Sequence, residues 1–236
     1  MNVKSSERLL SLDVMRGITI SGMILVNNPG DWGHVYALLR HAAWNGLTPT
    51  DLVFPFFMFI MGVSMFFSLR KYGLRLSRES VTKILRRTVV IFLVGFGLNL
   101  FGHILNHGFA EWEKVRILGV MQRLALAYGI GSLIGLAIKP KYLLHTAALI
   151  LIGYWALLGL TDSMEMTEQS LIATIDRTLF GETHMYHDTT AEGIRIAFDP
   201  EGLLSCIGSV AHVLLGFYAG KIILEGKNNK EQILQR

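Results

Sequence analysis

An imidazole, an amide and a carboxylate stand close together in the stretch that contains His41, Asn45 and Asp51. An imidazole suits proton transfer because its unperturbed pKa, about 6.5, lies near neutrality. The sequence within this stretch predicts the start of an apolar helix, with Thr48 as N-cap and Pro49 at the first helical position. His41 is therefore a candidate general base at the mouth of a membrane helix. The alternative is an interfacial histidine that only hydrogen-bonds the end of the helix.

Asp51 and Asn27 are the side chains that could assist His41. Asp51 would stand at the third helical position, where a carboxylate stabilises a helix N-terminus through the local dipole and the unpaired amides. The same carboxylate could instead orient His41 or hold an ammonium group, and one residue can do both. Asn27 ends the first apolar run, and its amide could donate to an oxyanion or orient the imidazole. The alternative is that Asn27 and the Asn28-Pro29-Gly30 that follows it simply end the helix.

Two further groups of polar residues lie within apolar runs, where a charge is costly unless it is paired or lines a cavity. Asp13 and Arg16 are three residues apart and share one helical face. They could form a structural ion pair, or Arg16 could receive phosphate groups from the cytoplasm. Gln122 and Arg123 fall about seven residues inside their apolar run, which predicts a depth of roughly 10 Å. If that helix begins outside the membrane, Arg123 is only interfacial.

The last apolar run begins with Asp199-Pro200-Glu201, which predicts a second helix start with Asp199 as N-cap. Glu201 would then be free to face the mouth of the bundle and bind a cation. Further along, Gly216 and Gly220 are four residues apart, which is a signature of closely packed membrane helices.

The composition indicates a membrane protein. The chain has 236 residues, of which 51% are hydrophobic and 17% are charged, and its mean hydropathy is +0.43; soluble domains carry about 25% charged residues. The net charge of +4 does not indicate nucleic-acid binding, because the basic residues stand in short segments between apolar runs. We expect an all-α transmembrane bundle that forms one domain over residues 1–236. Its six spans are predicted at residues 12–28, 50–69, 84–105, 116–138, 142–160 and 202–224.

The distribution of charge predicts how these spans are oriented. The segment between the second and third spans is basic and should be cytoplasmic, as should the N-terminus. Residues 161–201 are acidic and form a long non-cytoplasmic loop, in which an apolar pattern from Leu171 to Phe180 predicts a short amphipathic helix. No histidine spacing indicates a metal site. The single cysteine, Cys206, excludes an intrachain disulfide.

Several segments resemble the heparan-alpha-glucosaminide N-acetyltransferase family and its bacterial relatives. They are Leu12-Asp13-Val14-Met15-Arg16-Gly17, Val26-Asn27, residues 41–62, residues 115–123 and residues 198–205. The resemblance implies a multi-pass enzyme of the bacterial cytoplasmic (inner) membrane, which uses acetyl-CoA to acetylate an amino sugar on the far side. Family members run further, by about four spans, so we expect this chain to lack the C-terminal ones. They can also be dimeric, which makes a homo-oligomer a further expectation.

The resemblance also implies roles for particular residues. His41 matches the catalytic histidine of the family and Asn27 the asparagine beside it. From its position near His41, and not from the resemblance, we expect Asp51 to be the third catalytic residue. We expect the substrate to be bound by Trp44, Asn45, Gln122, Arg123 and Glu201, and acetyl-CoA by Arg16 and Asp13. No metal is expected. Two alternatives stay open, a transporter and a non-catalytic remnant. The sequence has no inverted repeat, which argues against a transporter.

Overall fold

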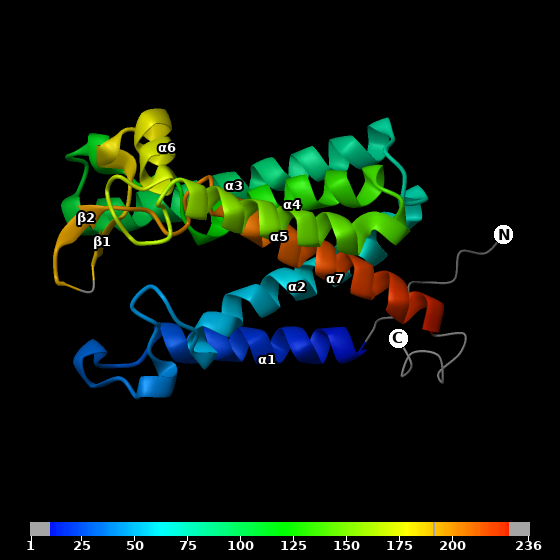
Figure 1. The fold of residues 1–236 in the computed structure, drawn as a ribbon, viewed down its shortest axis with the longest axis horizontal. Coiled ribbons are helices and arrows are strands. Elements are labelled where there is room, and N and C mark those ends of the chain that lie inside the picture. The colour runs from blue at the N-terminus through cyan, green and yellow to red at the C-terminus, as the bar shows by residue number, and fades with distance from the viewer. Residues whose placement is uncertain (1–9, 191, 227–236) are drawn as a thin grey trace.

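The computed structural model describes residues 10–190 and 192–226. Within these ranges the chain is almost entirely helical (Figure 1). Six helices are long and apolar enough to cross a membrane: α1 (Leu10–Asn27), α2 (Pro49–Leu69), α3 (Arg78–His107), α4 (Val120–Ala137), α5 (Leu143–Leu160) and α7 (Cys206–Gly226). The remaining elements are the short helix α6 (Leu171–Phe180) and the strands β1 (His187–Thr189) and β2 (Arg195–Ala197). The prediction of a six-span, all-α membrane bundle is thus confirmed.

Three of the predicted span boundaries are wrong, each at a helix start. Helix α3 begins at Arg78, six residues before the predicted span, because Ser77 caps it and accepts a hydrogen bond from the Ser80 amide at 3.1 Å. Helix α4 begins at Val120, so Arg116 lies in the connection before it. Helix α7 begins at Cys206, because the residues from Asp199 onward form turns instead of a first helical turn.

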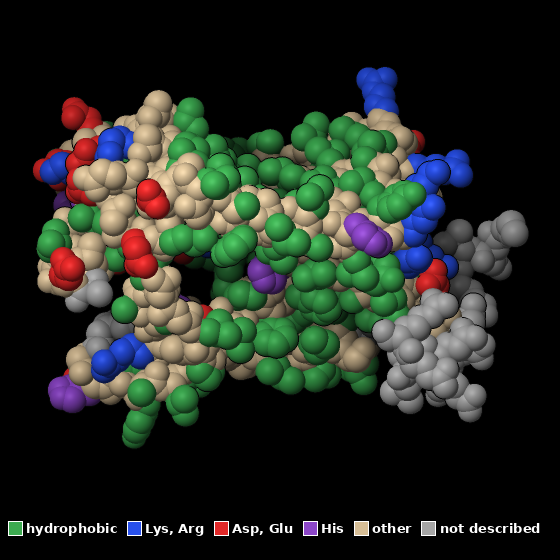
Figure 2. Space-filling view, in the orientation of Figure 1, with side chains coloured by type: hydrophobic (Ala, Val, Ile, Leu, Met, Phe, Trp, Pro, Cys, Tyr) green, Lys and Arg blue, Asp and Glu red, His purple; other side chains and the backbone are tan. Residues whose placement is uncertain are grey.

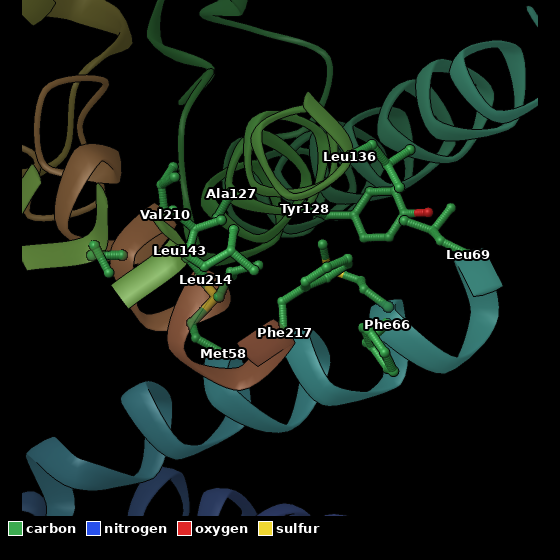
Figure 3. Packing of buried hydrophobic residues seen from close by; sticks show 14 of the residues in the cluster. Met58, Phe66, Leu69, Ala127, Tyr128, Leu136, Leu143, Val210, Leu214 and Phe217 are labelled. Atoms are coloured by element: carbon green, nitrogen blue, oxygen red, sulfur yellow. The ribbon is translucent and has the colours of Figure 1, made fainter. Parts of the chain in front are cut away.

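The centre of the bundle is the contact between α2 and α7. Gly62 and Gly216 face each other there, and a Cβ atom added to Gly62 would lie 3.0 Å from the Gly216 Cα. The two backbones therefore touch, as the glycine spacing of α7 predicts. Beside this contact, the rings of Phe66 and Phe217 pack edge to face, 5.3 Å apart, and Tyr128 of α4 closes the cluster (Figure 3).

Helices α1, α3 and α5 lie on the outside of this centre and leave large apolar side chains exposed. Helix α1 packs antiparallel to α2: Arg16 donates a hydrogen bond to the Ser64 Oγ at 3.1 Å, and Gly22 lies against Val53. Along α3 the side chains of Leu93 and Leu98 are more than half exposed. Exposed apolar faces on helices of this length are what a surrounding lipid phase requires.

The segment between α5 and α7 folds over one end of the bundle. Helix α6 is the amphipathic helix that the sequence predicts, and its Ile172 packs into a second apolar cluster with Phe198 and Leu204. Strands β1 and β2 form an antiparallel hairpin that pairs His187 with Ala197. The hairpin was not predicted, since each strand has only three residues.

Charged side chains divide between the two ends of the bundle (Figure 2). Lys and Arg gather at one end, here called the basic end, which contains residues 70–87 and the connection around Lys139 and Lys141. Asp and Glu gather at the other, here called the His41 end, which contains residues 28–48 and 161–205. On the face shown in Figure 2, the His41 end is hollowed between the layer that holds α1 and the layer that holds α5 and α6.

Candidate active site

His41 is held by a carboxylate at the first turn of α2. Its Nδ1 lies 2.7 Å from Asp51 Oδ1. An ionised carboxylate only accepts hydrogen bonds, so Nδ1 is the donor of this pair, and in the neutral ring Nε2 then keeps its lone pair. The His41 side chain is 60% exposed, whereas that of Asp51 is 22% exposed. The imidazole is therefore oriented from the protein side and accessible from solvent, as a general base must be.

The second oxygen of Asp51 fixes the loop that carries His41. Asp51 Oδ2 accepts hydrogen bonds from the amide of Thr48 at 2.8 Å, from its hydroxyl at 2.9 Å and from the amide of Ala42 at 3.2 Å. Thr48 is the N-cap of α2 and Pro49 its first residue, as the sequence predicts. Asp51 thus stabilises the helix start and orients the imidazole at once, so the two roles left open by the sequence coexist.

An open cavity of about 400 Å³ lies beside His41. It is lined by Gly33, Val35, Leu39, Arg40 and His41. All of these residues belong to the connection between α1 and α2. The same connection therefore carries His41 and lines the cavity beside it.

Asn27 stands at the last position of α1, and its amide is engaged within its own helix. Its Nδ2 donates to the carbonyl oxygen of Met23 at 2.8 Å. No hydrogen bond joins Asn27 to His41 or Asp51 in the described part of the chain. Donation by Asn27 to a reacting group would first require that this helical hydrogen bond be broken.

Trp44 and Asn45 connect the His41 loop to the segment after α5. Trp44 Nε1 donates to the carbonyl of Met164 at 2.8 Å, and its ring meets that of Phe198 edge to face at 5.0 Å. Asn45 Nδ2 donates to Glu165 Oε1 at 2.8 Å. These contacts across the chain hold the loop in place, so both side chains are already in use as positioning groups.

Arg116 is a member of this end of the bundle that the sequence analysis did not single out. Its guanidinium forms a bidentate pair with Asp199, with Nε 3.0 Å from Oδ2 and Nη2 2.6 Å from Oδ1, and it also pairs with Glu201. It lies over the ring of Tyr186, 4.6 Å from the centroid. Burial opposes its charge, but the hydrogen bonds and the charges of Asp199 and Glu201 outweigh burial and raise the pKa of Arg116. The expectation of a free Glu201 carboxylate is therefore wrong, because Arg116 holds it.

Replacing Arg116 by glutamine should destabilise the protein by about 3 kcal/mol, because Asp199 is 1% exposed and would be left as a buried carboxylate without its cation. Thermal unfolding in detergent measures the effect. Lys114→Gln is the matched control, since Lys114 pairs with Glu111 at the surface and should leave the unfolding temperature unchanged. Equal effects of the two substitutions would contradict the structural importance of the Arg116 pair.

Gln122 and Arg123 lie in the first turn of α4, so they are not preceded by the seven helical residues on which the predicted depth rests. Arg123 is satisfied by α7 and the turn before it: Nε donates to Ser209 Oγ at 2.7 Å, and Nη1 to the carbonyl of Pro200 at 3.3 Å. Its guanidinium also lies 5.1 Å from the centroid of Phe54 in α2. Gln122 is 1% exposed, and its Nε2 has no hydrogen-bond partner among the described residues. Arg123 thus joins three helices, and Gln122 keeps an unused donor.

Asp13 and Arg16 form the ion pair that their spacing predicts, with 3.5 Å between Arg16 Nη1 and Asp13 Oδ1. Both side chains are 43% exposed, and Arg16 also donates to Ser64 on α2. The pair lies in the half of α1 that is nearer the basic end, well away from His41.

Asp176 is a second residue that the sequence analysis did not single out. Its Oδ1 accepts a hydrogen bond from the Leu203 amide at 2.9 Å, and its Oδ2 is buried without a partner in the described structure. Burial raises the pKa of Asp176 to about 6, and the nearby charge of Asp199 adds to the shift. Asp176 therefore ties α6 to the turn before α7 through a carboxyl group that is easily protonated.

The stability of the protein should depend on the protonation of Asp176. Its pKa is about 6 in the folded protein, against an ordinary value of 3.8, so between these values the folded state keeps a proton that the unfolded chain has lost. Stability should thus fall as the pH rises through this range, by about 4 °C in melting temperature. Asp176→Asn should flatten this part of the pH profile, while Glu168→Gln, at an exposed site in the same segment, should not. Identical pH profiles for wild type and Asp176→Asn would refute the assignment.

Six apolar spans, with an oriented, solvent-accessible imidazole at one end, define a multi-pass membrane protein with a candidate site for proton transfer. Residues 8–178 match the family model described as heparan-alpha-glucosaminide N-acetyltransferase, catalytic. The chain belongs to this family of N-acetyltransferases. The matched region contains the His41–Asp51 pair, Arg116 and Arg123, and it ends before Glu201.

Two curated relatives cover nearly the whole chain. The heparan-alpha-glucosaminide N-acetyltransferase of Homo sapiens is 32% identical, over 97% of this chain and 40% of its own length. The protein of the same name from Mus musculus is 30% identical, over 98% of this chain and 41% of its own length. The chain therefore spans about two-fifths of the length of the curated relatives that it matches.

The structure places the predicted site residues in three groups, apart from Asn27, whose amide is bonded within α1. His41 and Asp51 form the first, which Trp44 and Asn45 hold in place. Gln122, Arg123 and Glu201 belong to the junction of α4 with the start of α7, and Asp13 and Arg16 lie toward the opposite end. In residues 10–190 and 192–226, no group of three His, Cys, Asp or Glu side chains could hold a metal ion.

Proposed function

We propose that this chain transfers an acetyl group from acetyl-CoA to the amine of an amino sugar of the glucosamine type, with His41 as the general base. The observation that carries the proposal is the hydrogen bond between His41 Nδ1 and Asp51, which in the neutral ring leaves Nε2 with its lone pair on a side chain that is 60% exposed. Membership of the N-acetyltransferase family supports the transfer of an acetyl group to an amine of the glucosaminide type. Acetyl-CoA as the donor is part of the proposal.

The reaction needs a proton acceptor, because an amino sugar is largely protonated near neutral pH and an ammonium nitrogen has no lone pair. The ammonium first releases one proton to water, and the neutral amine attacks the thioester carbonyl carbon while His41 Nε2 takes a second proton from its nitrogen. The C–N bond forms, the tetrahedral oxyanion collapses and the C–S bond breaks. The departing thiolate of CoA then takes the proton from the imidazolium, so that the free imidazole returns. The charge of Asp51 stabilises the imidazolium while it exists.

The remaining site residues have narrower roles in this proposal. Asn27 would donate to the oxyanion after releasing the carbonyl of Met23. Glu201 would bind the ammonium of the sugar only if its carboxylate bound Arg116 and the ammonium at the same time. Arg16 would bind a phosphate of CoA by exchanging its present partner Asp13, in the half of α1 nearer the basic end.

The proposal includes an orientation in a bacterial inner membrane. Lys and Arg at the basic end favour a cytoplasmic position for that end, which makes the His41 end and residues 161–201 non-cytoplasmic. Acetyl-CoA would then reach the site from the cytoplasm and the sugar from the other side, within a single transmembrane domain.

Release of CoA thiol by the purified protein in detergent tests the proposed function. Thiol release from acetyl-CoA should increase when glucosamine is added, and N-acetylglucosamine should appear in equal amount. Glucose and N-acetylglucosamine, which lack a free amine, should give no increase. Folded protein that releases no thiol in response to any amino sugar would overturn the proposal.

A further inference from the structure

An open groove lies at the basic end, along the first turns of α3. Its volume is about 880 Å³. The residues that matter for its chemistry are Tyr72, Arg78, Lys83, Arg86, Arg87 and Val90. The groove is far along the bundle from His41, and the proposed acetyl transfer does not use it.

The groove carries an excess of positive charge. Arg78, Lys83, Arg86 and Arg87 face one carboxylate, that of Glu79. Across the described residues, none of these four cations takes part in an ion pair with an acidic side chain. Such a concentration of guanidinium and ammonium groups matches the charge and the acceptor oxygens of a phosphate.

Aromatic rings hold two of these cations in position. Lys83 Nζ lies 5.5 Å from the centroid of Tyr72, and the Arg87 guanidinium lies 4.8 Å from that of Tyr128. A ring attracts a cation through its face and leaves the N–H groups available to another acceptor. The groove is therefore organised before any anion binds.

One side of the groove continues into apolar surface. Val90 lines the groove and is 52% exposed, and Val94 and Phe101 follow it on α3 with exposures of 51% and 59%. A Cβ atom added at Gly97, between them, would meet nothing within 4 Å. Because residues three and four apart share one helical face, a shallow apolar track runs from the cationic groove past the middle of α3. Helix α3 is also the least buried of the six spans.

We propose that this groove binds the phosphate of an anionic phospholipid, with the acyl chains along Val90, Val94 and Phe101. The cations match the head group and the apolar track matches the chains. A soluble phosphate compound such as CoA would use only the first of these features. The surplus of positive charge favours an anionic lipid over a zwitterionic one, whose own cation would face Arg78, Arg86 and Arg87.

Binding of defined lipids to the purified full chain tests this proposal. The probes are phosphatidylglycerol, phosphatidylcholine and free CoA, and native mass spectrometry of protein transferred from mixed micelles counts the lipid that stays bound. Phosphatidylglycerol should be retained at least about tenfold more strongly than phosphatidylcholine. CoA added in excess should not displace it.

Two double substitutions, each removing two positive charges, distinguish lipid binding by the groove from attraction to the overall positive charge of the basic end. Lys83→Gln with Arg86→Gln should weaken phosphatidylglycerol binding by about tenfold. Arg87 is left in place because it packs on Tyr128. Lys139→Gln with Lys141→Gln removes the same charge at exposed sites outside the groove and should leave binding unchanged. An equal loss in both, no preference over phosphatidylcholine, or displacement by CoA would each overturn the proposal.

Discussion

Replacing His41 by glutamine should lower kcat for acetyl transfer by about a thousandfold and leave KM for acetyl-CoA nearly unchanged. Glutamine can still hydrogen-bond Asp51 but cannot accept a proton near neutral pH. Since His41 lies at the surface of a loop and is 60% exposed, the substitution should not disturb packing. Thiol release at saturating glucosamine measures kcat, and the melting temperature shows that the fold is intact.

The chain contains a closely matched control for this substitution. His34 also forms a hydrogen bond to a carboxylate, with Nδ1 2.6 Å from Asp31 Oδ2, and it belongs to the same connection between α1 and α2. Asp31, unlike Asp51, does not belong to the first turn of α2. His34→Gln should therefore retain full activity, and a loss equal to that of His41→Gln would contradict the assignment of the base.

Replacing Gly216 by alanine should destabilise the bundle by about 2 kcal/mol or more, because the new methyl group would collide with the Phe59 carbonyl of α2. Two helix backbones cannot move apart to admit it without loosening the contacts around Phe66 and Phe217. The measurement is thermal unfolding in detergent, together with the yield of monodisperse protein.

Gly208→Ala is the control, since it makes the same change on the same helix. A Cβ atom at Gly208 would meet nothing within 4 Å, so this variant should be as stable as wild type or slightly more stable, given the better helix propensity of alanine. Equal stability of Gly216→Ala and Gly208→Ala would show that the contact between α2 and α7 does not hold the bundle together.

Much of the fold could be predicted because lipid imposes simple rules on sequence. Long apolar runs identify all six spans, and the Thr48-Pro49 start of α2 follows from local capping. The start of α4 could not be predicted, because contacts distant in sequence hold the apolar residues before it extended. Asn99 donates to the carbonyls of Arg116 and Leu118, and the Ile117 amide donates to the carbonyl of His184.

The candidate site was predictable to a similar degree. The pairing of His41 with Asp51 follows from residues close in sequence and a helix start between them. Trp44 and Asn45 each bind a partner that is 120 residues away in the sequence, so no local sequence pattern predicts these contacts. The pairing of Arg116 with Glu201 was missed for the same reason, and Arg116 was taken as the first residue of a predicted span.

Transfer of a labelled acetyl group from acetyl-CoA to glucosamine tests the central claim most directly, when wild type, His34→Gln and His41→Gln are compared as folded proteins. Wild type and His34→Gln should form labelled N-acetylglucosamine at equal rates, and His41→Gln should form almost none. Equal transfer by all three proteins, or transfer by none, would contradict the account.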